Sequence, residues 1–252
     1  MTALTGRSVL VTGAASGIGA AVAGRCLRAG AQVGGIDIDR AALAEAASAH
    51  GACFTAIPVD IRDELAVHTA LAALGSRFTD VHGLVNCAGV GGYTGDVTET
   101  SVADWQRIIG VNLTGAYVVS RVVLPRMRGR PGAALVHVSS QYGMVGGAGF
   151  PAYCAAKAGL IGLTRAMAVD HGPDGVRVNC VCPGPTDTPM LRRGARQPDA
   201  GARENNRVRL RSLLPSPADP DQVAGVIGFL LGSDAAQMTG AVVPVDGGWT
   251  AS

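Results

Sequence analysis

A tyrosine and a lysine four residues apart are the first candidates for chemistry in this sequence. They stand in the stretch AYCAAKAGL as Tyr153 and Lys157. Because residues i and i+4 lie on one face of a helix, a helix here would place the phenol beside the ammonium. Lys157 is also the one lysine among the 21 lysine and arginine residues of the chain. A position that keeps lysine where arginine serves everywhere else suggests a specific need for an ammonium.

The chemistry that this pair offers is proton transfer. A free tyrosine has a pKa near 10, so work as an acid or base near neutral pH needs a depression of roughly three units, about 4 kcal/mol. One cation about 4 Å away supplies about that much at an effective dielectric constant near 20. An ammonium is a compact charge, whereas a guanidinium is a bulky planar fork. We therefore predict that Lys157 lowers the pKa of Tyr153; the alternative is a solvated lysine kept by chance on a helix.

A glycine-rich turn offers a second kind of chemistry, the binding of phosphate. The stretch VLVTGAASGIGAAVAG places Gly13, Gly17 and Gly19 between an apolar run and a helix-like run. The first glycine permits a tight turn, the second lets backbone approach a pyrophosphate, and the third lets the helix pack close to the sheet. The N-terminus of the helix then presents free N–H groups to the anion. Alone this pattern is weak, because similar turns also serve structure only.

Asp37 strengthens the case for a dinucleotide. It ends the next apolar run, where a carboxylate can accept hydrogen bonds from the hydroxyls of the adenosine ribose. The same charge repels a 2′-phosphate, and Ser16 and Ile38 stand where an arginine would welcome that phosphate. We therefore expect NAD rather than NADP. The alternative is that Asp37 merely caps a helix beginning near Asp39.

The elements that must position these residues alternate along the whole chain. Short apolar runs predict strands at 7–12, 31–37, 53–60, 81–89, 133–140, 175–184 and 240–248. Longer runs predict helices at 17–30, 39–51, 62–77, in two regions near 101–128, at 151–172 and at 219–234. This alternation predicts an α/β fold with right-handed crossovers and one doubly wound, seven-stranded parallel sheet.

Composition narrows the class of protein further. Of 252 residues, 48% are hydrophobic and 16% are charged, so one α/β domain with a large core is expected. A net charge of +2 is too small to indicate binding to nucleic acid or to a membrane. No run of about twenty apolar residues predicts a membrane span, and the first residues do not resemble a signal peptide. The six cysteines form no C-x-x-C pair and the histidines no H-x-x-x-H pair, so we expect free thiols, a cytoplasmic protein and no metal site.

Short motifs along the chain resemble those of one enzyme family. The sequence is similar to the classical short-chain dehydrogenases/reductases (SDR) from about residue 5 to 250. Two positions depart from the family pattern: Cys87 replaces an asparagine, and Thr186 replaces an aliphatic residue. The matching motifs are TGAASGIG (12–19), NCAG (86–89), VNLTG with Asn112, HVSSQYG with Ser140, YCAAK (153–157) and CPGPTDT (182–188).

The resemblance implies a role for each matching residue. Tyr153 is implied to be the acid/base, Ser140 to hydrogen-bond the substrate oxygen, and Lys157 to lower the phenol pKa and bind the nicotinamide ribose. Asn112 is implied to hold a water in a proton relay. The expected cofactor-binding residues, from the glycine turn and the resemblance together, are Gly13, Ser16, Gly17, Ile18, Gly19, Asp37, Asp60, Ile61, Asn86, Ala88, Gly89, Tyr153, Lys157, Pro183, Gly184, Thr186 and Thr188.

The substrate is expected to meet Ser140, Tyr142 and Tyr153. Ser139 is expected to point away from it, because adjacent residues of a strand alternate faces. Tyr142 is interpreted as a wall of the substrate pocket, with plain packing as the alternative. The glycine-rich stretch 143–153 suggests a pocket rim of small side chains. Trp249 is either a subunit contact or a packing residue.

The segment 189–215 breaks the regular pattern, being polar, irregular and rich in arginine. By resemblance it is the lid over the substrate site. Seven arginines against one aspartate and one glutamate suggest that it pairs with an anionic group of the substrate; the alternative is a solvated, mobile loop. These arginines are Arg192, Arg193, Arg196, Arg203, Arg207, Arg209 and Arg211.

The function that these residues favour is an NAD-dependent oxidoreductase that interconverts a secondary alcohol and a ketone by hydride transfer. The resemblance implies a Rossmann-type single domain and a homotetramer. The alternatives are a ketoacyl-type carbonyl reductase and a non-catalytic NAD-binding homologue. The sequence does not identify the substrate, which is expected to be a small molecule.

Overall fold

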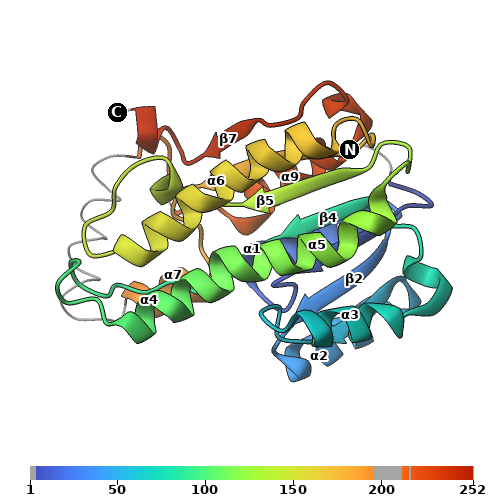
Figure 1. Cartoon of the computed structure of the whole chain (residues 1–252), viewed down its shortest axis with the longest axis horizontal. Coiled ribbons are helices and arrows are strands. Elements are labelled where there is room, and N and C mark those ends of the chain that lie inside the picture. Colours follow the sequence, from blue (N-terminus) through green and yellow to red (C-terminus); the bar gives the residue numbers. More distant parts are fainter. Residues whose placement is uncertain (1–3, 196–211, 216, 252) are drawn as a thin grey trace.

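The strands form a single seven-stranded parallel sheet (Figure 1). The computed structural model describes residues 4–195, 212–215 and 217–251. Along the sheet the order is β3-β2-β1-β4-β5-β6-β7, and every neighbouring pair is parallel. The strands are β1 Ser8–Thr12, β2 Gln32–Asp37, β3 Phe54–Pro58, β4 Gly83–Asn86, β5 Ala134–Val138, β6 Arg177–Pro183 and β7 Val242–Val245. The doubly wound sheet predicted from the alternating pattern is confirmed.

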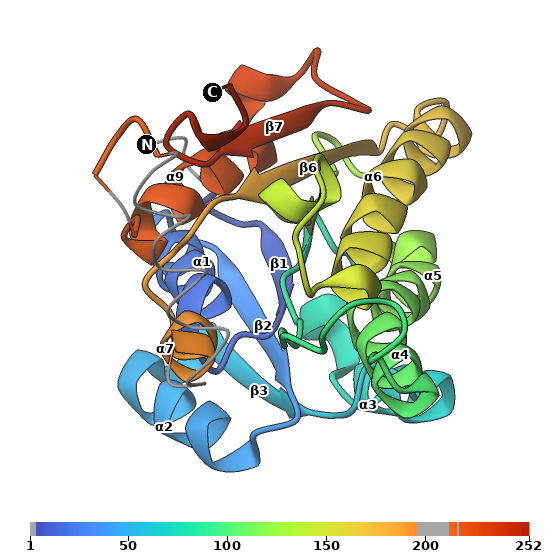
Figure 2. The same ribbon diagram turned by 90° about the vertical axis from the view of Figure 1, so that its left-hand side faces the viewer.

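Helices cover both faces of the sheet, as Figure 2 shows when the sheet is seen nearly end-on. The helices are α1 Gly17–Arg28, α2 Arg40–His50, α3 Glu64–Ala72, α4 Val102–Ile109, α5 Ala116–Met127, α6 Pro151–His171, α7 Pro189–Ala195 and α9 Pro220–Leu231. Short 3₁₀ helices span Gly51–Cys53, Gly75–Phe78, Gln141–Gly143, Ser233–Ala235 and Trp249–Ala251. One face of the sheet packs against α1, α2 and α9, and the other against α3, α5 and α6.

The strands are apolar on both faces because both faces are buried. In β1, Val9 and Val11 point toward α1 and α9, whereas Leu10 points toward the helices of the opposite face. All three are at most 1% exposed. Side chains of a strand alternate between faces, so a strand covered on both sides reads as an unbroken hydrophobic run. This is the pattern that made the seven strands recognisable.

The two helical regions predicted near 101–128 are joined into one continuous helix. A π-helical turn, Gly110–Gly115, connects α4 to α5. Such turns widen a helix locally and are frequent at functional sites, and this one carries Asn112. Of the described helices, Val102–Met127 is the one long and apolar enough to cross a membrane, but half of its most apolar window is buried inside the protein. One such helix is weak evidence of a membrane span.

The sheet reverses its winding between β1 and β4. Strand order runs outward to β2 and β3 on one side and to β5, β6 and β7 on the other. In open α/β sheets a ligand crevice lies at the carboxyl ends of the strands at this switch point. The glycine turn follows β1 there, the NCAG turn follows β4, and Ser140 follows β5. The fold therefore gathers the predicted motifs at one edge.

The segment 189–215 begins as a helix rather than as an irregular loop, because α7 spans Pro189–Ala195. The remainder up to residue 211 lies outside the described residues, and so do five of its seven arginines.

Candidate active site

The glycine turn leaves no room for side chains. A Cβ added to Gly13 would lie 2.9 Å from the backbone N and Cα of Ala88, and one on Gly17 would lie 3.1 Å from the methyl of Thr188. A Cβ on Gly19 would collide with the carbonyl of Gly13. Gly13 and Gly17 also have φ angles of +69° and +55°, which favour glycine. Glycine at these three positions is thus required by the protein's own packing and backbone angles, and the approach of a pyrophosphate to Gly17 stays a prediction.

The N-terminus of α1 is open to an anion. Ser16 occupies the cap position, yet its side chain makes no capping hydrogen bond. No acidic residue stands in the first turn of α1. The backbone N–H groups and the positive end of the helix dipole are therefore available to a phosphate.

Asp37 lies beside this turn. Its Oδ2 accepts a hydrogen bond from the backbone N–H of Ala15 at 3.1 Å, and its Oδ1 accepts one from that of Asp39 at 3.1 Å. The cap of α2 is Asp39 itself, whose side chain accepts from the N–H of Ala42 at 3.0 Å. The alternative that Asp37 only caps this helix is therefore wrong. Next to Asp37, the side chain of Ile38 is largely exposed, at 71%. Because it is a hydrocarbon, position 38 supplies no positive charge beside the carboxylate.

The predicted catalytic residues are gathered where β5 meets α6. Tyr153 and Lys157 are one turn apart on α6, and Ser140 follows β5 and is hydrogen-bonded to Tyr153. The Nζ of Lys157 donates to the carbonyl of Val138 at 2.9 Å and lies 5.5 Å from the centre of the Tyr153 ring. Ser139 donates to the backbone carbonyl of Lys157 at 2.7 Å, so it points away from the phenol as expected.

The electrostatics of this pair differ from the sequence-based expectation. Burial is the main cause that raises the pKa of Tyr153 to about 12, against a hydrogen bond with Ser140 that lowers it. Burial also lowers the pKa of Lys157 to about 8. The predicted lowering of the phenol pKa is thus wrong for these side chains alone. Both groups are taken out of water, which disfavours their charged forms.

Asn112 faces a small space between Gly89 and Lys157. It is fully buried, and its Nδ2 donates to the carbonyls of Val90 at 2.8 Å and Ile108 at 2.9 Å. Its Oδ1 has no partner among the described residues. A Cβ on Gly89 would lie 2.7 Å from that oxygen and 3.6 Å from the Nζ of Lys157. Oδ1 of Asn112 is therefore a buried acceptor without a partner, close to the ammonium.

The NCAG turn is held in place by Thr12, which sequence reasoning did not single out. The hydroxyl of Thr12 accepts from the backbone N–H groups of Cys87 and Ala88, each at 3.0 Å. Thr12 is the first residue of the TGAASGIG motif, and this position in the motif could have singled it out from the sequence. Burial raises the pKa of the Cys87 thiol to about 12, so the residue that departs from the family pattern is a neutral group.

Asn86 turns its side chain into the protein rather than toward the glycine turn. Its Nδ2 donates to the hydroxyl of Ser120 at 2.9 Å and lies 3.3 Å from Nδ1 of His137. Ser120 uses its own proton on the carbonyl of Ala116 at 2.7 Å. The hydroxyl must therefore accept from Asn86, and Nδ1 of His137 must be an unprotonated acceptor. Asn86 joins β4 to α5, and the structure does not bring its side chain to the cofactor position.

Two further predicted residues, Asp60 and Ile61, are engaged elsewhere. Arg62 donates to both carboxylate oxygens of Asp60, at 2.6 to 3.1 Å, and these hydrogen bonds lower the pKa of Asp60. Ile61 is 6% exposed, and its side chain packs against Gly115 in the π-helical turn. The expected contact of these residues with the cofactor stays a prediction.

The loop after β6 closes the crevice from the other side. Gly184 lies so near Asp246 that a Cβ there would be 2.7 Å from its Cα. Thr186 is 5% exposed and donates to the carbonyl of Gly184 at 3.0 Å, so its hydroxyl is satisfied where the family has an aliphatic residue. Thr188 accepts from the N–H of Leu191 and faces Gly17. This brings the loop that begins at Pro183 next to the glycine turn.

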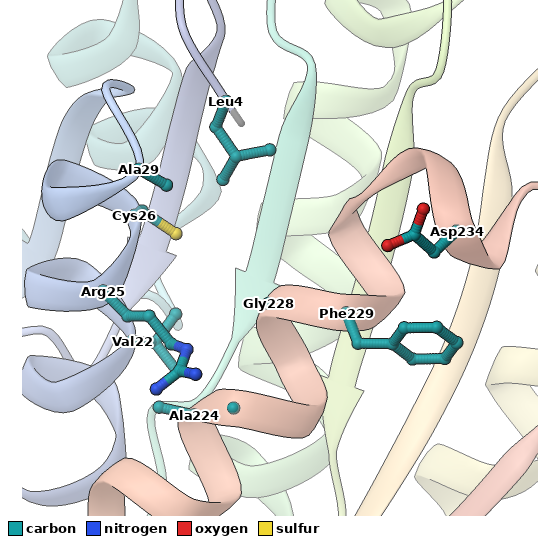
Figure 3. Close-up of a pocket in the computed structure, with 10 residues that line it drawn as sticks. Leu4, Val22, Arg25, Cys26, Ala29, Ala224, Gly228, Phe229 and Asp234 are labelled. Atoms are coloured by element: carbon teal, nitrogen blue, oxygen red, sulfur yellow. The ribbon is translucent and has the colours of Figure 1, made fainter. Parts of the chain in front are cut away.

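Other features do not gather around Tyr153. A hollow between α1 and α9 is lined by Arg25, Cys26 and Phe229, among others, and Leu4 and Asp234 border it (Figure 3). Because Leu4 precedes β1, this hollow lies toward the amino ends of the strands. Among the described residues no three His, Cys, Asp or Glu side chains are grouped to hold a metal ion. All six cysteines are free, and Cys180 and Cys182 are buried in the sheet, as expected.

Comparison with known proteins agrees with this geometry. A protein-family model described as "Enoyl-(Acyl carrier protein) reductase" matches residues 13–250. Meso-2,3-butanediol dehydrogenase of Serratia marcescens is 38% identical over 97% of this chain and 94% of its own length. The chain belongs to the short-chain dehydrogenase/reductase family. Its Rossmann-type sheet superimposes on the crystal structure of levodione reductase with a TM-score of 0.90, at 32% identity, covering 98% of this chain and 99% of that one.

Another relative shows that this family resemblance does not by itself establish turnover. The protein named inactive 2-(S)-hydroxypropyl-CoM dehydrogenase 2, from Xanthobacter autotrophicus, is 38% identical over 89% of this chain and 97% of its own length. The named relatives include dehydrogenases and reductases of alcohols and ketones with different substrates. An oxidoreductase of the SDR family is therefore the coarse function of this chain, and its substrate is not given by the relatives.

Proposed function

We propose that this protein is an NAD-dependent enzyme that interconverts a secondary alcohol and a ketone, with Tyr153 as the general acid/base. The observation that carries the proposal is the grouping of Ser140, Tyr153, Lys157 and the open Oδ1 of Asn112 beside the glycine turn. Each residue offers a role that proton transfer needs: a phenol, a charge beside it, a donor for the reacting oxygen and a route for the proton.

The residues present fit a nicotinamide dinucleotide. The uncapped N-terminus of α1, with Gly13 and Gly17 left bare, suits the pyrophosphate. The carboxylate of Asp37 suits the adenosine ribose and disfavours a 2′-phosphate. When bound, the nicotinamide would accept or donate the hydride at the carbinol carbon. The Nζ of Lys157, which lies near Gly89, would hold the ribose that carries the nicotinamide.

The proton chemistry follows from the two pKa values. With a pKa of about 12, Tyr153 keeps its proton at neutral pH and can give it to a ketone oxygen that Ser140 also contacts. Oxidation of an alcohol needs the phenolate instead. Lys157, with a pKa of about 8, is charged at neutral pH and stabilises that phenolate. The ammonium and Asn112 are the groups by way of which the proton of the phenol would be passed on.

Two other functions are kept. A ketoacyl-type carbonyl reductase is the second candidate, because the matching family model is described by an acyl-carrier substrate. The inactive relative favours a non-catalytic NAD-binding homologue as the third. Asp37 argues against an NADPH-dependent reductase, and the complete set of Asn112, Ser140, Tyr153 and Lys157 argues against a protein without catalysis.

We propose a cytoplasmic homotetramer for this enzyme, on the family resemblance and the six free thiols. Segment 189–215 is proposed as the lid over the substrate. Within its described part, Arg192 already pairs with Asp187 at 2.8 Å. Light scattering of the purified protein tests the tetramer, since a monomer in dilute solution would contradict it.

Turnover by the wild type and by Tyr153→Phe tests the proposed function. The wild type is expected to reduce NAD⁺ with a panel of secondary alcohols. The variant is expected to lose about 10²–10⁴-fold in kcat because it lacks the transferable proton, while still binding NADH by fluorescence titration. Tyr117→Phe is the matched control, because it removes a hydroxyl from an exposed tyrosine on α5. Unchanged kcat in Tyr153→Phe, or no turnover by the wild type, would contradict the proposal.

A further inference from the structure

Five of the ten phenylalanine, tyrosine and tryptophan residues of this chain, Tyr153 among them, are linked in one cluster. The chain has four phenylalanines, four tyrosines and two tryptophans. Phe150 lies at the centre of the cluster, stacked on Tyr142 with ring centres 5.3 Å apart and set edge-on to Tyr93 at 5.8 Å. Its ring is 6.4 Å from that of Tyr153, and Tyr142 continues to Trp249 at 5.8 Å. The wall that adjoins the reacting phenol is therefore aromatic.

The glycines near this wall make room for rings. A Cβ on Gly149 would overlap the ring of Tyr93, and one on Gly147 would lie 2.9 Å from the ring of Tyr142. The interpretation of 143–153 as a pocket rim of small side chains stays a prediction. The small residues in the loop allow large rings from elsewhere to approach, and those rings form the surface.

The open side of the cluster is apolar. Tyr142 and Trp249 are buried, at 8% and 3% exposure, whereas Tyr93 is 39% exposed and Phe150 is partly exposed. Tyr142 thus packs behind Phe150, and the rings that a ligand can touch are Phe150 and Tyr93. Exposed hydrophobic side chains also occur in the loop after Tyr142 and in the segment that packs on Gly247 and Gly248 beside Trp249, namely Met144, Val145, Leu213 and Leu214.

Two cations of the described residues near this surface, Arg107 and Lys157, already have partners. Arg107 approaches Gly92, next to Tyr93, but donates to the carboxylate of Asp104 at 2.8 Å. The ammonium of Lys157 is 4% exposed and faces the ring of Tyr153 and the carbonyl of Val138. The rings of the cluster carry no positive charge, so a carboxylate or phosphate placed against Phe150 would lose its water without a compensating contact from the cluster itself, which is costly.

We propose that the substrate is an uncharged secondary alcohol or ketone that carries a hydrocarbon ring at or next to the carbinol carbon, and that Phe150 and Tyr93 bind this ring. The proposal rests on the alcohol–ketone chemistry proposed above. A ring seated at 4.5–7 Å from two mutually perpendicular aromatic rings extends an edge-to-face arrangement, whereas a short acyclic chain buries little area there. The same contacts bring the carbinol close to Tyr153, because the rings of Phe150 and Tyr153 have their centres 6.4 Å apart.

A comparison of three alcohols tests the substrate class. The kcat/KM of the wild type is measured for 1-phenylethanol, 2-butanol and 3-hydroxybutyrate, with the better of NAD⁺ and NADP⁺. We expect 1-phenylethanol to exceed 2-butanol at least tenfold and 3-hydroxybutyrate to be the poorest. Turnover that favours either acyclic alcohol overturns the ring-binding proposal while the alcohol–ketone function stands. No turnover of any alcohol with either cofactor overturns both.

Variants of the two accessible rings test the residues. Phe150→Ala and Tyr93→Ala are each expected to raise KM for 1-phenylethanol at least tenfold and KM for 2-butanol less than threefold. Tyr117→Ala, which removes an exposed ring outside the cluster, is the control and should change neither. Because Phe150→Ala risks misfolding, the melting temperature and Tyr93→Ala are measured beside it. Equal effects on the KM of both alcohols would overturn the assignment. A change of particle mass with unchanged KM would also overturn it, because these rings would then be a subunit contact.

Discussion

The glycine turn after β1 and the polar cluster around Lys157 differ in the groups that they offer to a ligand. At the turn, side chains are absent, and the binding groups are backbone N–H groups that need little more than clearance. Around Lys157, side chains are buried and held by specific partners, such as the carbonyl of Val138 for the ammonium. The first region is built by removing atoms, and the second by taking charged and polar groups out of water.

The free-energy costs of the two regions therefore differ in kind. A glycine turn has a steric and conformational cost that arises only when a Cβ is added. The buried cluster carries a standing electrostatic cost, seen in the pKa of Lys157, which falls from its ordinary 10.5 to about 8. That shift corresponds to about 3 kcal/mol against the charged form. Substitutions in the first region should act through space, and those in the second through charge and hydrogen bonding.

The largest effect is expected for Lys157→Arg. It keeps the charge, yet the position is 4% exposed and shaped around one nitrogen that donates to Val138. A guanidinium has five donors and a wider outline, so kcat/KM for any alcohol substrate should fall at least about 100-fold, near 3 kcal/mol. Steady-state kinetics measures it. Arg165→Lys, an exposed swap on the same helix, is the control. Wild-type kcat in Lys157→Arg would mean that the lone lysine is an accident of composition.

Gly13→Ala should come next, and Gly75→Ala provides the comparison that separates space from backbone strain. Both glycines have positive φ, +69° and +60°. A Cβ on Gly75 meets nothing within 4 Å, whereas one on Gly13 lies 2.9 Å from the backbone of Ala88. Urea unfolding should show a loss of about 1 kcal/mol for Gly75→Ala and at least about 2 kcal/mol for Gly13→Ala, the latter with weakened NADH binding. Equal losses would contradict the steric account of the turn.

A smaller effect is expected from acid, through His137. Burial lowers the pKa of this histidine from its ordinary 6.5 to about 3. Below pH 6.5 the unfolded chain takes up a proton that the folded chain does not, so stability falls with pH until about pH 3. Between pH 6.5 and 5 the loss from this group should be about 2 kcal/mol. His137→Asn should lack that part of the slope when urea unfolding is compared at the two pH values. An identical slope in both proteins would show that His137 is not the group responsible.

The smallest effect is expected for cofactor choice. The wild type should use NAD(H) at least about tenfold better than NADP(H) by kcat/KM, or about 1.4 kcal/mol. Asp37→Ala removes the charge that opposes a 2′-phosphate and should relax this preference. The variant also frees the N–H of Ala15, which Asp37 accepts at 3.1 Å. Glu45→Ala, a carboxylate change on the neighbouring α2, is the control. Equal or better use of NADP(H) by the wild type would sink the NAD assignment.

The sequence by itself determined the parts of this protein that depend on local pattern. The seven strands could be read because β-branched runs such as SVLVT are buried on both faces. The roles of Gly13, Gly17 and Gly19 could be read because a missing Cβ has the same steric meaning in any fold of this kind. The i and i+4 spacing of Tyr153 and Lys157 placed them on one helix face before their surroundings were known.

Only the tertiary structure decided what depends on partners distant in the chain. The sequence predicted a lowered pKa for Tyr153, but its sign follows from burial by other elements, which outweighs a charge 5.5 Å from the ring centre. The sequence could not show that the side chain of Asn86 pairs with Ser120 of α5 and His137 of β5, because only the fold brings these residues together. The aromatic wall joins Tyr93, Phe150 and Trp249 from three separate segments. Desolvation and ring packing sum contributions from all sides, so no local spacing encodes them.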